Sequence, residues 1–151
     1  MPDALLARLS IDHAIERADR AIVICTVDAD GWSHPAMLSS LEVVAHDAHH
    51  IRLAIHINAR STRNINANGK LTLILADEEG VFYIKGDAVQ VSPAMVAAPG
   101  HAIFHLRVVS IREDHAAAYE NARITSGIRV ARGTLDIARA EAVIRELMAD
   151  P

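Results

Sequence analysis

The feature that most constrains the fold is a segment in which apolar and polar residues alternate with a period of two. The alternating positions are, in order, Ile51, Arg52, Leu53, Ala54, Ile55, His56, Ile57 and Asn58. Successive side chains of a β-strand point to opposite faces of a sheet, so this pattern predicts a strand with one buried face.

Five further segments are typical of strands, because apolar and β-branched residues run between turn signals. They are residues 21–27, 32–45, 71–76, 81–91 and 102–111. Asp30-Gly31 predicts a hairpin between the first two strands, and Pro35 favours an edge position for the second. Gly86, inside the fifth strand, indicates a bulge or a close backbone approach. Six strands with short turns predict a mainly antiparallel β-barrel.

Helical spacing of apolar residues appears at the periphery of this pattern. We expect one or two short helices within residues 4–18, and further helices over residues 60–67, 112–119 and 137–148. Gly69 suits the C-terminus of the helix expected over residues 60–67, and Asp136 can cap the helix expected over residues 137–148.

The composition limits the classes of function. The chain has 151 residues, 51% of them hydrophobic, so we expect a single domain spanning residues 1–151. Its net charge of −4 argues against nucleic acid and anionic membranes as partners. The single cysteine, Cys25, cannot form an internal disulfide, and no segment has the pattern of a membrane span or a secretory signal. We therefore expect a cytoplasmic protein.

A basic, hydroxyl-rich turn follows the alternating strand. It comprises Arg60, Ser61, Thr62, Arg63 and Asn64. Guanidinium groups, hydroxyls and free backbone N–H groups at a helix start are what a phosphate needs, and Lys70 can add charge from the far end of the helix. The alternative is that Ser61 and Thr62 only cap the helix while the arginines are solvated. The local sequence leaves both interpretations open.

The order of these segments resembles that of a known family. It consists of a strand with an Asp-Gly hairpin (ICTVDADGWSHPAMLSSLEV), the alternating strand (IRLAIHI), the basic turn (RSTRNINANGK), a strand (LTLILAD) and a strand with a central glycine (VFYIKGDAV). Over about residues 12–115, the chain resembles the pyridoxamine 5′-phosphate oxidase-like FMN-binding split-barrel family. The resemblance implies a six-stranded split β-barrel of Greek-key type, FMN as the cofactor, and a homodimer with the cofactor at the subunit interface.

The resemblance also implies roles for particular residues. The turn after the third strand grips the flavin phosphate in such proteins, which assigns the residues from Arg60 to Arg63 to that role and makes Asn64 a supporting residue. The second strand lies along the flavin ring and the third ends near it, which adds Met37, Leu38, Ser39, Ser40, His56, Ile57 and Asn58.

Two departures from the family pattern matter. Many members carry a lysine three residues before the asparagine, where this chain has Ser61. The serine- and arginine-rich signature by which true pyridoxamine-phosphate oxidases hold substrate near the C-terminus is absent. We therefore do not expect oxidation of a B6 vitamer.

Histidines offer a competing kind of site. His46, Asp47, His49 and His50 could ligate a metal, but adjacent residues on a strand face opposite ways and no further ligand set is recognisable. We expect a solvated turn there and no metal site. His101 and His105, near the start of the sixth strand, are expected to be packed or surface-exposed.

Together these observations favour an FMN-dependent oxidoreductase that acts on a small organic substrate. No catalytic side chain is identifiable, which is consistent with a cofactor that carries the redox chemistry. One alternative is a non-catalytic protein that binds or senses a flavin, a deazaflavin or haem on the same barrel. Another is a barrel with an empty site that contacts other proteins.

Overall fold

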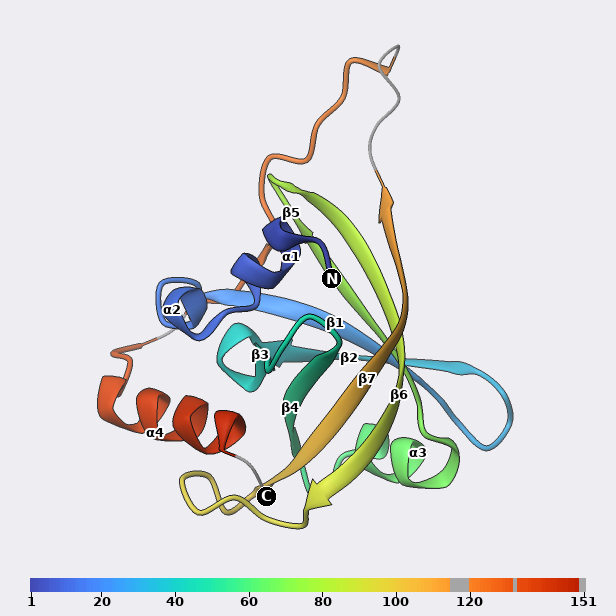
Figure 1. Ribbon diagram of the computed structural model, residues 1–151, viewed down its shortest axis with the longest axis vertical. Coiled ribbons are helices and arrows are strands. Elements are labelled where there is room, and N and C mark those ends of the chain that lie inside the picture. Colours follow the sequence, from blue (N-terminus) through green and yellow to red (C-terminus); the bar gives the residue numbers. More distant parts are fainter. Residues whose placement is uncertain (115–119, 132, 150–151) are drawn as a thin grey trace.

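The protein was analysed as a computed structural model, which describes residues 1–114, 120–131 and 133–149. Figure 1 shows a strongly curved sheet with helices around it. The elements are, in chain order, α1 (Asp3–Arg8), α2 (Ile11–Ala14), β1 (Arg20–Val27), β2 (Ser33–Ser39), the 3-10 helix η1 (Ser40–Glu42), β3 (Val43–Ala45), β4 (His50–His56), α3 (Arg60–Asn68), β5 (Lys70–Asp77), β6 (Gly80–Ser92), β7 (His101–Asp114), β8 (Ile128–Arg129) and α4 (Ile137–Met148).

The strands form one sheet in the order β2-β1-β5-β6-β7-β4-β3, and β8 pairs with β1. Every described pairing is antiparallel. The long strands β6 and β7 curve across the molecule and join the two halves of the sheet (Figure 1). This architecture confirms the antiparallel split barrel with peripheral helices. The predicted count of six strands is wrong, because the described chain contributes eight.

The extra strands arise at two places. The segment 32–45 does not form one strand, because a turn of 3-10 helix separates β2 from β3. The Ser39 hydroxyl accepts a hydrogen bond from the Leu41 N–H at 3.2 Å, and the Glu42 carboxylate accepts one from the Ser39 N–H at 2.6 Å. This capping box stabilises the helical turn against the extended conformation. The second addition is β8, which lies outside the segments predicted as strands.

Strand β7 is longer than predicted. It continues through Asp114, which pairs with Val81 of β6. The expected helical start at Arg112 is therefore wrong, because pairing with a long neighbouring strand supplies backbone hydrogen bonds that outweigh local helical preference. Residues 115–119, which complete that predicted helix, lie outside the described part of the chain.

The inner face of the sheet carries the larger core. Alternating residues of neighbouring strands meet there in rows, as with Ile24, Leu73 and Ile84 of β1, β5 and β6. Phe104 of β7 pairs with Leu53 of β4, and both are fully buried. The core is therefore built largely from aliphatic side chains.

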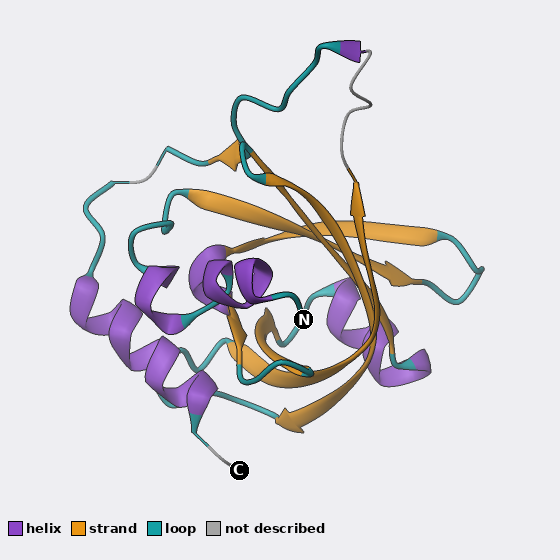
Figure 2. Cartoon of the chain, turned by 45° about the horizontal axis from the view of Figure 1, so that its top comes forward, coloured by secondary structure: helices purple, strands orange, loops and turns teal. Residues whose placement is uncertain are grey.

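A second core lies between α4 and the outer face of β3, β4 and β7. Ile144 and Leu147 of α4 are buried there in a cluster that includes Val44, Ala54 and Ile103. Figure 2 shows α4 lying along this side of the barrel. The helix begins as predicted, because the Asp136 carboxylate accepts a hydrogen bond from the Arg139 N–H at 3.0 Å. Among the described helices, none combines the length and apolar character needed to span a membrane.

Three positions that the sequence singled out have the expected local geometry. Pro35 lies on β2, whose described neighbour is β1 alone, so it occupies an edge. Gly69 ends α3 with a left-handed φ of 69°. The register shifts between Lys85 and Gly86, and a Cβ on Gly86 would lie 2.4 Å from the Arg107 carbonyl oxygen. Gly86 therefore marks both a bulge and a close backbone approach.

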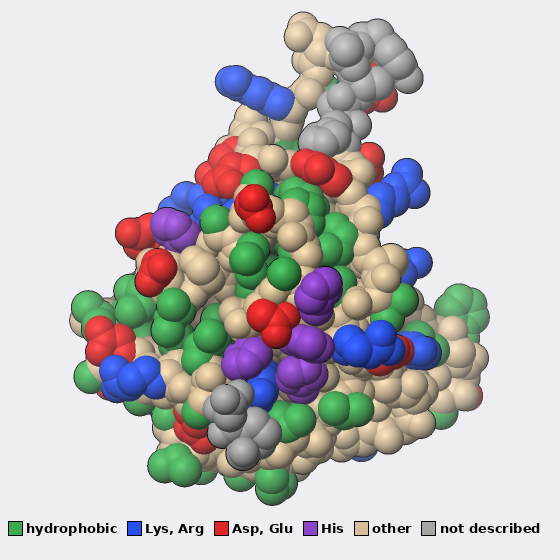
Figure 3. All heavy atoms as spheres, in the orientation of Figure 1, with side chains coloured by type: hydrophobic (Ala, Val, Ile, Leu, Met, Phe, Trp, Pro, Cys, Tyr) green, Lys and Arg blue, Asp and Glu red, His purple; other side chains and the backbone are tan. Residues whose placement is uncertain are grey.

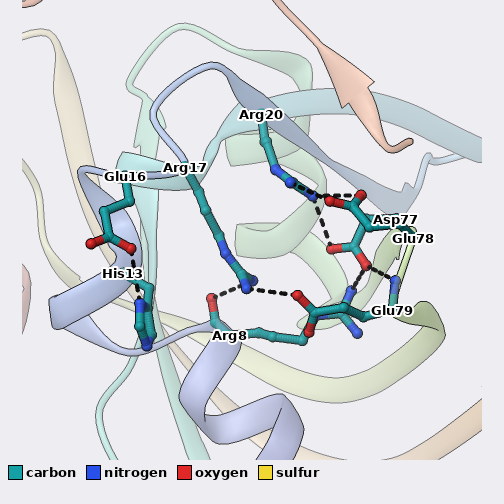
Figure 4. A network of polar contacts seen from close by, with 8 residues as sticks. All are labelled: Arg8, His13, Glu16, Arg17, Arg20, Asp77, Glu78 and Glu79. Atoms are coloured by element: carbon teal, nitrogen blue, oxygen red, sulfur yellow. Dashed lines mark hydrogen bonds and ion pairs between the residues drawn. The ribbon is translucent and has the colours of Figure 1, made fainter. Parts of the chain in front are cut away.

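Ion pairs attach the N-terminal segment to the turn between β5 and β6 (Figure 4). Arg8 Nη2 lies 2.5 Å from Asp77 Oδ1, and both side chains are 3% exposed. The Arg8 guanidinium also lies 5.1 Å from the Phe82 ring centroid. Nearer the surface, Arg17 pairs with Glu79 at 3.0 Å and Arg20 with Glu78 at 2.6 Å. The N-terminal helices thereby close one end of the barrel.

Candidate functional site

The first turn of α3 begins where β4 ends. The N-cap residue is Ala59, and no side chain caps the helix. Ser61 and Thr62 lie inside the helix, so the alternative in which their hydroxyls cap it is not what the structure shows. The first N–H groups of a helix have no partner within the helix, so this turn presents donors at the positive end of the helix dipole.

The side chains of this turn divide into exposed and buried groups. Arg60 and Arg63 are exposed. Arg63 donates from Nη1 to the Asn58 carbonyl oxygen at 3.0 Å. The Thr62 hydroxyl donates to the His56 carbonyl oxygen at 2.8 Å, which fixes the helix start against the end of β4. Ser61 is 1% exposed, and its hydroxyl has no hydrogen-bond partner among the described residues.

Two of the predicted residues have structural partners elsewhere. Asn64 is buried, and its amide donates to the Thr26 hydroxyl of β1 at 2.9 Å. Lys70 lies past the other end of α3, where its ammonium group pairs with Asp87 at 2.6 Å. The structure therefore groups the residues from Arg60 to Arg63 in one turn but does not bring Lys70 to them.

A cavity of about 650 Å³ lies on the other side of the end of β4, between β2, η1 and α4. Met37, Leu38 and Ser39 of β2 line it. Ser40 does not line it, because its hydroxyl hydrogen-bonds to the Arg17 carbonyl oxygen. The wall is completed by Ala21, Leu41, Glu42, Ala54, Ala98, His101, Val130, Gly133, Thr134, Leu135, Asp136, Arg139, Ala140 and Val143.

A ring contact links His56, at the end of β4, to the wall of the cavity. The ring of His101, which lines the cavity, packs edge-on against the His56 ring with 5.5 Å between centroids. His56 Nδ1 accepts a hydrogen bond from the Asn58 N–H at 3.2 Å. The neighbouring Ile57 is 39% exposed. Of the predicted residues at the end of β4, His56 therefore contacts the cavity wall through His101, and none of the three lines the cavity itself.

The cavity wall contains a polar pair, Glu42 and His101, that was not predicted from the sequence. Glu42 Oε1 lies 3.3 Å from His101 Nε2, while its other oxygen accepts from the Ser39 N–H. The serine-to-glutamate spacing of a capping box was a usable signal for Glu42. His101 had no such signal, since its position beside Glu42 depends on the pairing of β7 with β4. Arg139 likewise reaches the cavity only through the docking of α4.

The histidine-rich turn between β3 and β4 has local partners. Asp47 accepts hydrogen bonds from the His49 N–H at 2.6 Å and from the His50 ring at 2.8 Å. The His50 ring lowers the pKa of Asp47 to about 2. Across residues 1–114, 120–131 and 133–149, no group of three or more histidine, cysteine or acidic side chains is arranged to hold a metal ion.

Comparison with known proteins identifies one related sequence. The chain is 32% identical over 130 residues to the Bacillus subtilis protein YclD, a match that covers 86% of this chain and 82% of YclD. No model of a protein family matches the sequence.

Solved structures share the fold at lower identity. A putative pyridoxamine 5′-phosphate oxidase from Lactobacillus delbrueckii has a TM-score of 0.52 and 18% identity, covering 69% of this chain and 93% of its own. An F420 reductase has a TM-score of 0.53 and 14% identity, covering 66% and 94%. HutZ, the haem storage protein of Vibrio cholerae, has a TM-score of 0.51 and 15% identity, covering 68% and 89%. The chain therefore belongs to the same family as YclD, and it has the split-barrel fold of these solved structures, among them the putative pyridoxamine 5′-phosphate oxidase.

Proposed function

We propose that the protein binds FMN and acts as a flavin-dependent oxidoreductase on a small organic substrate. The observation that carries this proposal is a cationic, uncapped helix start that follows His56, whose ring contacts His101 in the wall of a cavity of about 650 Å³. A flavin nucleotide has the matching parts, since it joins a dianionic phosphate to a large, mostly apolar ring. The ring contact between His56 and His101 links the end of β4 to the cavity wall.

The basic turn fits a phosphate in three ways. The exposed guanidinium groups of Arg60 and Arg63 provide charge and directed donors. The uncapped first turn adds backbone N–H groups. The Ser61 hydroxyl is a buried donor for which the described chain supplies no acceptor. An anion at the helix start would improve the hydrogen bonding of this turn.

The cavity fits a ring system. Its wall combines apolar side chains such as Met37, Leu38 and Val143 with the polar pair Glu42 and His101. When bound, FMN would supply the hydride-transfer chemistry. The chain would hold the cofactor, exclude water through the packing of α4, and orient its polar groups. The Glu42 carboxylate lies 3.3 Å from His101 Nε2, so it would orient this ring in the cavity wall.

An apolar outer face supports the proposed homodimer. Met37, Val23, Ile74 and Tyr83 pair in one row across β2, β1, β5 and β6. Met37 is 64% exposed, and the other three are partly exposed. A contiguous apolar strip of this kind is typical of a protein–protein contact, and a second copy of the chain would cover it. Met37 also lines the cavity, so such a dimer would place the cofactor near the subunit interface.

A cytoplasmic location belongs to the same proposal. Cys25 is a free thiol, and a chain with one cysteine gains nothing from an oxidising compartment.

A second candidate is non-catalytic binding of a deazaflavin or haem. Solved structures with this fold include an F420 reductase and a haem storage protein. The exposed imidazole ring of His56 is a group that could ligate haem iron.

The test is retention of FMN. Apo protein, shown by circular dichroism to be folded, is mixed with FMN and desalted, and its absorbance spectrum is recorded. We expect flavin absorbance to remain with the protein. Folded protein that retains no flavin would exclude the main proposal. The spectrum of freshly purified protein separates the two candidates, because oxidised flavin, deazaflavin and haem absorb differently.

A further inference from the structure

The histidine-rich turn is part of a larger cluster that the proposed cofactor site does not use. Figure 3 shows histidines gathered on one face of the molecule. The His50 ring lies 4.7 Å from the His105 ring, centroid to centroid, and 6.4 Å from the His49 ring. His105 comes from β7 and reaches the turn because β7 pairs with β4 in a register that places it opposite Arg52.

Arg52 is the unusual member of this cluster. The residue is 4% exposed, and its Nε is buried without a hydrogen-bond partner among the described residues. No carboxylate in the described part of the chain forms an ion pair with it. A buried charge without a counter-charge is unfavourable, so such a group ordinarily has a partner.

The neighbouring carboxylate is already engaged. Asp47 accepts hydrogen bonds from the His49 N–H, the His50 N–H and the His50 ring. Arg107 of β7 lies opposite His50 in the pairing of β4 with β7. Arg107 forms an ion pair with Asp87, which also pairs with Lys70. Asp47 and Asp87 are therefore already engaged with residues other than Arg52.

The lowered pKa of His105 is consistent with a positive electrostatic potential around its ring. Burial lowers the pKa of His105, and the positive charge of Arg52 lowers it further, together with His50 and His46. Asp47 acts in the opposite direction but does not outweigh them. A positive potential of this kind repels a divalent cation, so the cluster is better suited to an anion than to the metal that its histidines first suggest.

We propose that Arg52, His50 and His105 form a binding site for a small oxyanion, either a phosphate or a carboxylate group. The Arg52 guanidinium offers donors in a planar fork that matches two oxygens of such an anion. The His50 ring uses Nδ1 for Asp47, so its Nε2 donates to an anion when the ring is protonated. His105 is partly exposed and gives access from solvent.

This site is distinct from the basic turn of α3. Arg52 and His56 are four residues apart on β4, a separation of about 13 Å along a strand. The inference therefore does not depend on FMN binding. The same anion could occupy both places in solution, so the experiment must report on the cluster itself.

The readout is the pKa of the His105 imidazole, measured by NMR in sodium phosphate and in sodium chloride at equal ionic strength. The resonance is assigned by its absence in His105→Gln. We expect phosphate to raise this pKa by about one unit, because an anion close to the ring favours its protonated form. Equal pKa values in the two salts would overturn the proposal. A parallel titration with acetate distinguishes the ligands: a shift with both anions supports an oxyanion site, and a shift with phosphate alone supports a phosphate site.

Variants show which residues are required for the phosphate-dependent shift in the pKa of His105. Arg52→Met removes the guanidinium and should abolish the phosphate-dependent shift, even though it raises the pKa of His105 in chloride. Arg52→Lys keeps the positive charge but removes the planar guanidinium, and it should reduce the phosphate-dependent shift by about half or more. This variant also provides the test if Arg52→Met does not fold. Arg63→Ala, which alters the basic turn, should leave the shift unchanged. A full shift in both Arg52 variants, or its loss in Arg63→Ala, would contradict the assignment.

Discussion

The Asn64 side-chain amide donates a hydrogen bond of 2.9 Å to the Thr26 hydroxyl inside the barrel. Asn64 is 8% exposed and Thr26 is fully buried. The bond joins the first turns of α3 to β1, and neither group has access to bulk water as a substitute partner. The position of the basic turn therefore depends on a buried contact between two polar side chains.

Loss of this contact should reduce stability. Asn64→Ala leaves the Thr26 hydroxyl without its donor, and we expect the free energy of unfolding to fall by about 2 kcal/mol. The matched control is Asn66→Ala on the same helix, where an exposed amide bonds Gln90 at 2.8 Å and a change of less than about 0.5 kcal/mol is expected. Urea denaturation measures both. Similar losses in the two variants would show that the buried bond has no special role.

Removal of a guanidinium from the basic turn should weaken FMN binding. Arg63→Ala removes a charged donor, so we expect the dissociation constant for FMN to rise about tenfold, with little change in stability. Arg145→Ala removes an exposed arginine that pairs with Glu141 on α4 and should leave FMN affinity unchanged. Fluorescence titration measures the affinities. Unchanged affinity in Arg63→Ala would remove this residue from the phosphate site, and a large loss of stability would indicate that it anchors the fold.

The close approach at Gly86 should not tolerate a side chain. A Cβ there would lie 2.4 Å from the Arg107 carbonyl oxygen and 2.6 Å from Leu106 Cδ1. We expect Gly86→Ala to lower the free energy of unfolding by about 3 kcal/mol, because the paired backbones of β6 and β7 must separate. Gly133→Ala is the control, since nothing lies within 4 Å of the added atom. Thermal denaturation that does not distinguish these variants would rule out the steric explanation.

The buried pair of Arg8 and Asp77 gives a further prediction. Asp77→Asn keeps the shape of the side chain but removes the buried counter-charge of Arg8 and leaves only the half-exposed Glu79, 3.6 Å from Arg8 Nε. A loss of about 3 kcal/mol is expected. Glu79→Gln changes a 49% exposed carboxylate in the same network and should cost less than about 1 kcal/mol. Chemical denaturation of the two variants provides the comparison. A larger loss in Glu79→Gln than in Asp77→Asn would contradict the importance of burial.

Acid should destabilise the protein in a defined range. The hydrogen bond from Arg20 lowers the pKa of Glu78 from 4.5 to about 2. Because the folded-state pKa is lower than the unfolded one, the stabilising contribution is present above about pH 4.5 and disappears as the pH falls to about 2. Glu78→Gln should therefore lower the melting temperature near pH 6 and match the wild type near pH 2. A constant difference between the two proteins at every pH would exclude this linkage.

Much of the fold could be predicted because its signals are local. Alternation over residues 51–58 predicted β4, and the Asp-Gly pair predicted the first hairpin. The structure differs where long-range pairing decides the outcome. Asp114 remains in β7 because Val81 of β6 lies opposite it. The break between β2 and β3 had a local signal, the capping box from Ser39 to Glu42, but a strand interpretation of the surrounding apolar residues obscured it.

The candidate site likewise has a part that the local sequence predicts and a part that depends on tertiary contacts. The sequence by itself determined the basic turn, because its residues are adjacent in the chain and a helix start has the same donors in any fold. Only the tertiary structure decided which side chains of that turn face solvent, how Glu42 meets His101, and that Arg52 lies buried beside His105. These contacts depend on the register between β4 and β7 and on the docking of α4. Strand register is fixed by the burial of a whole face of the sheet, which no short segment of sequence specifies.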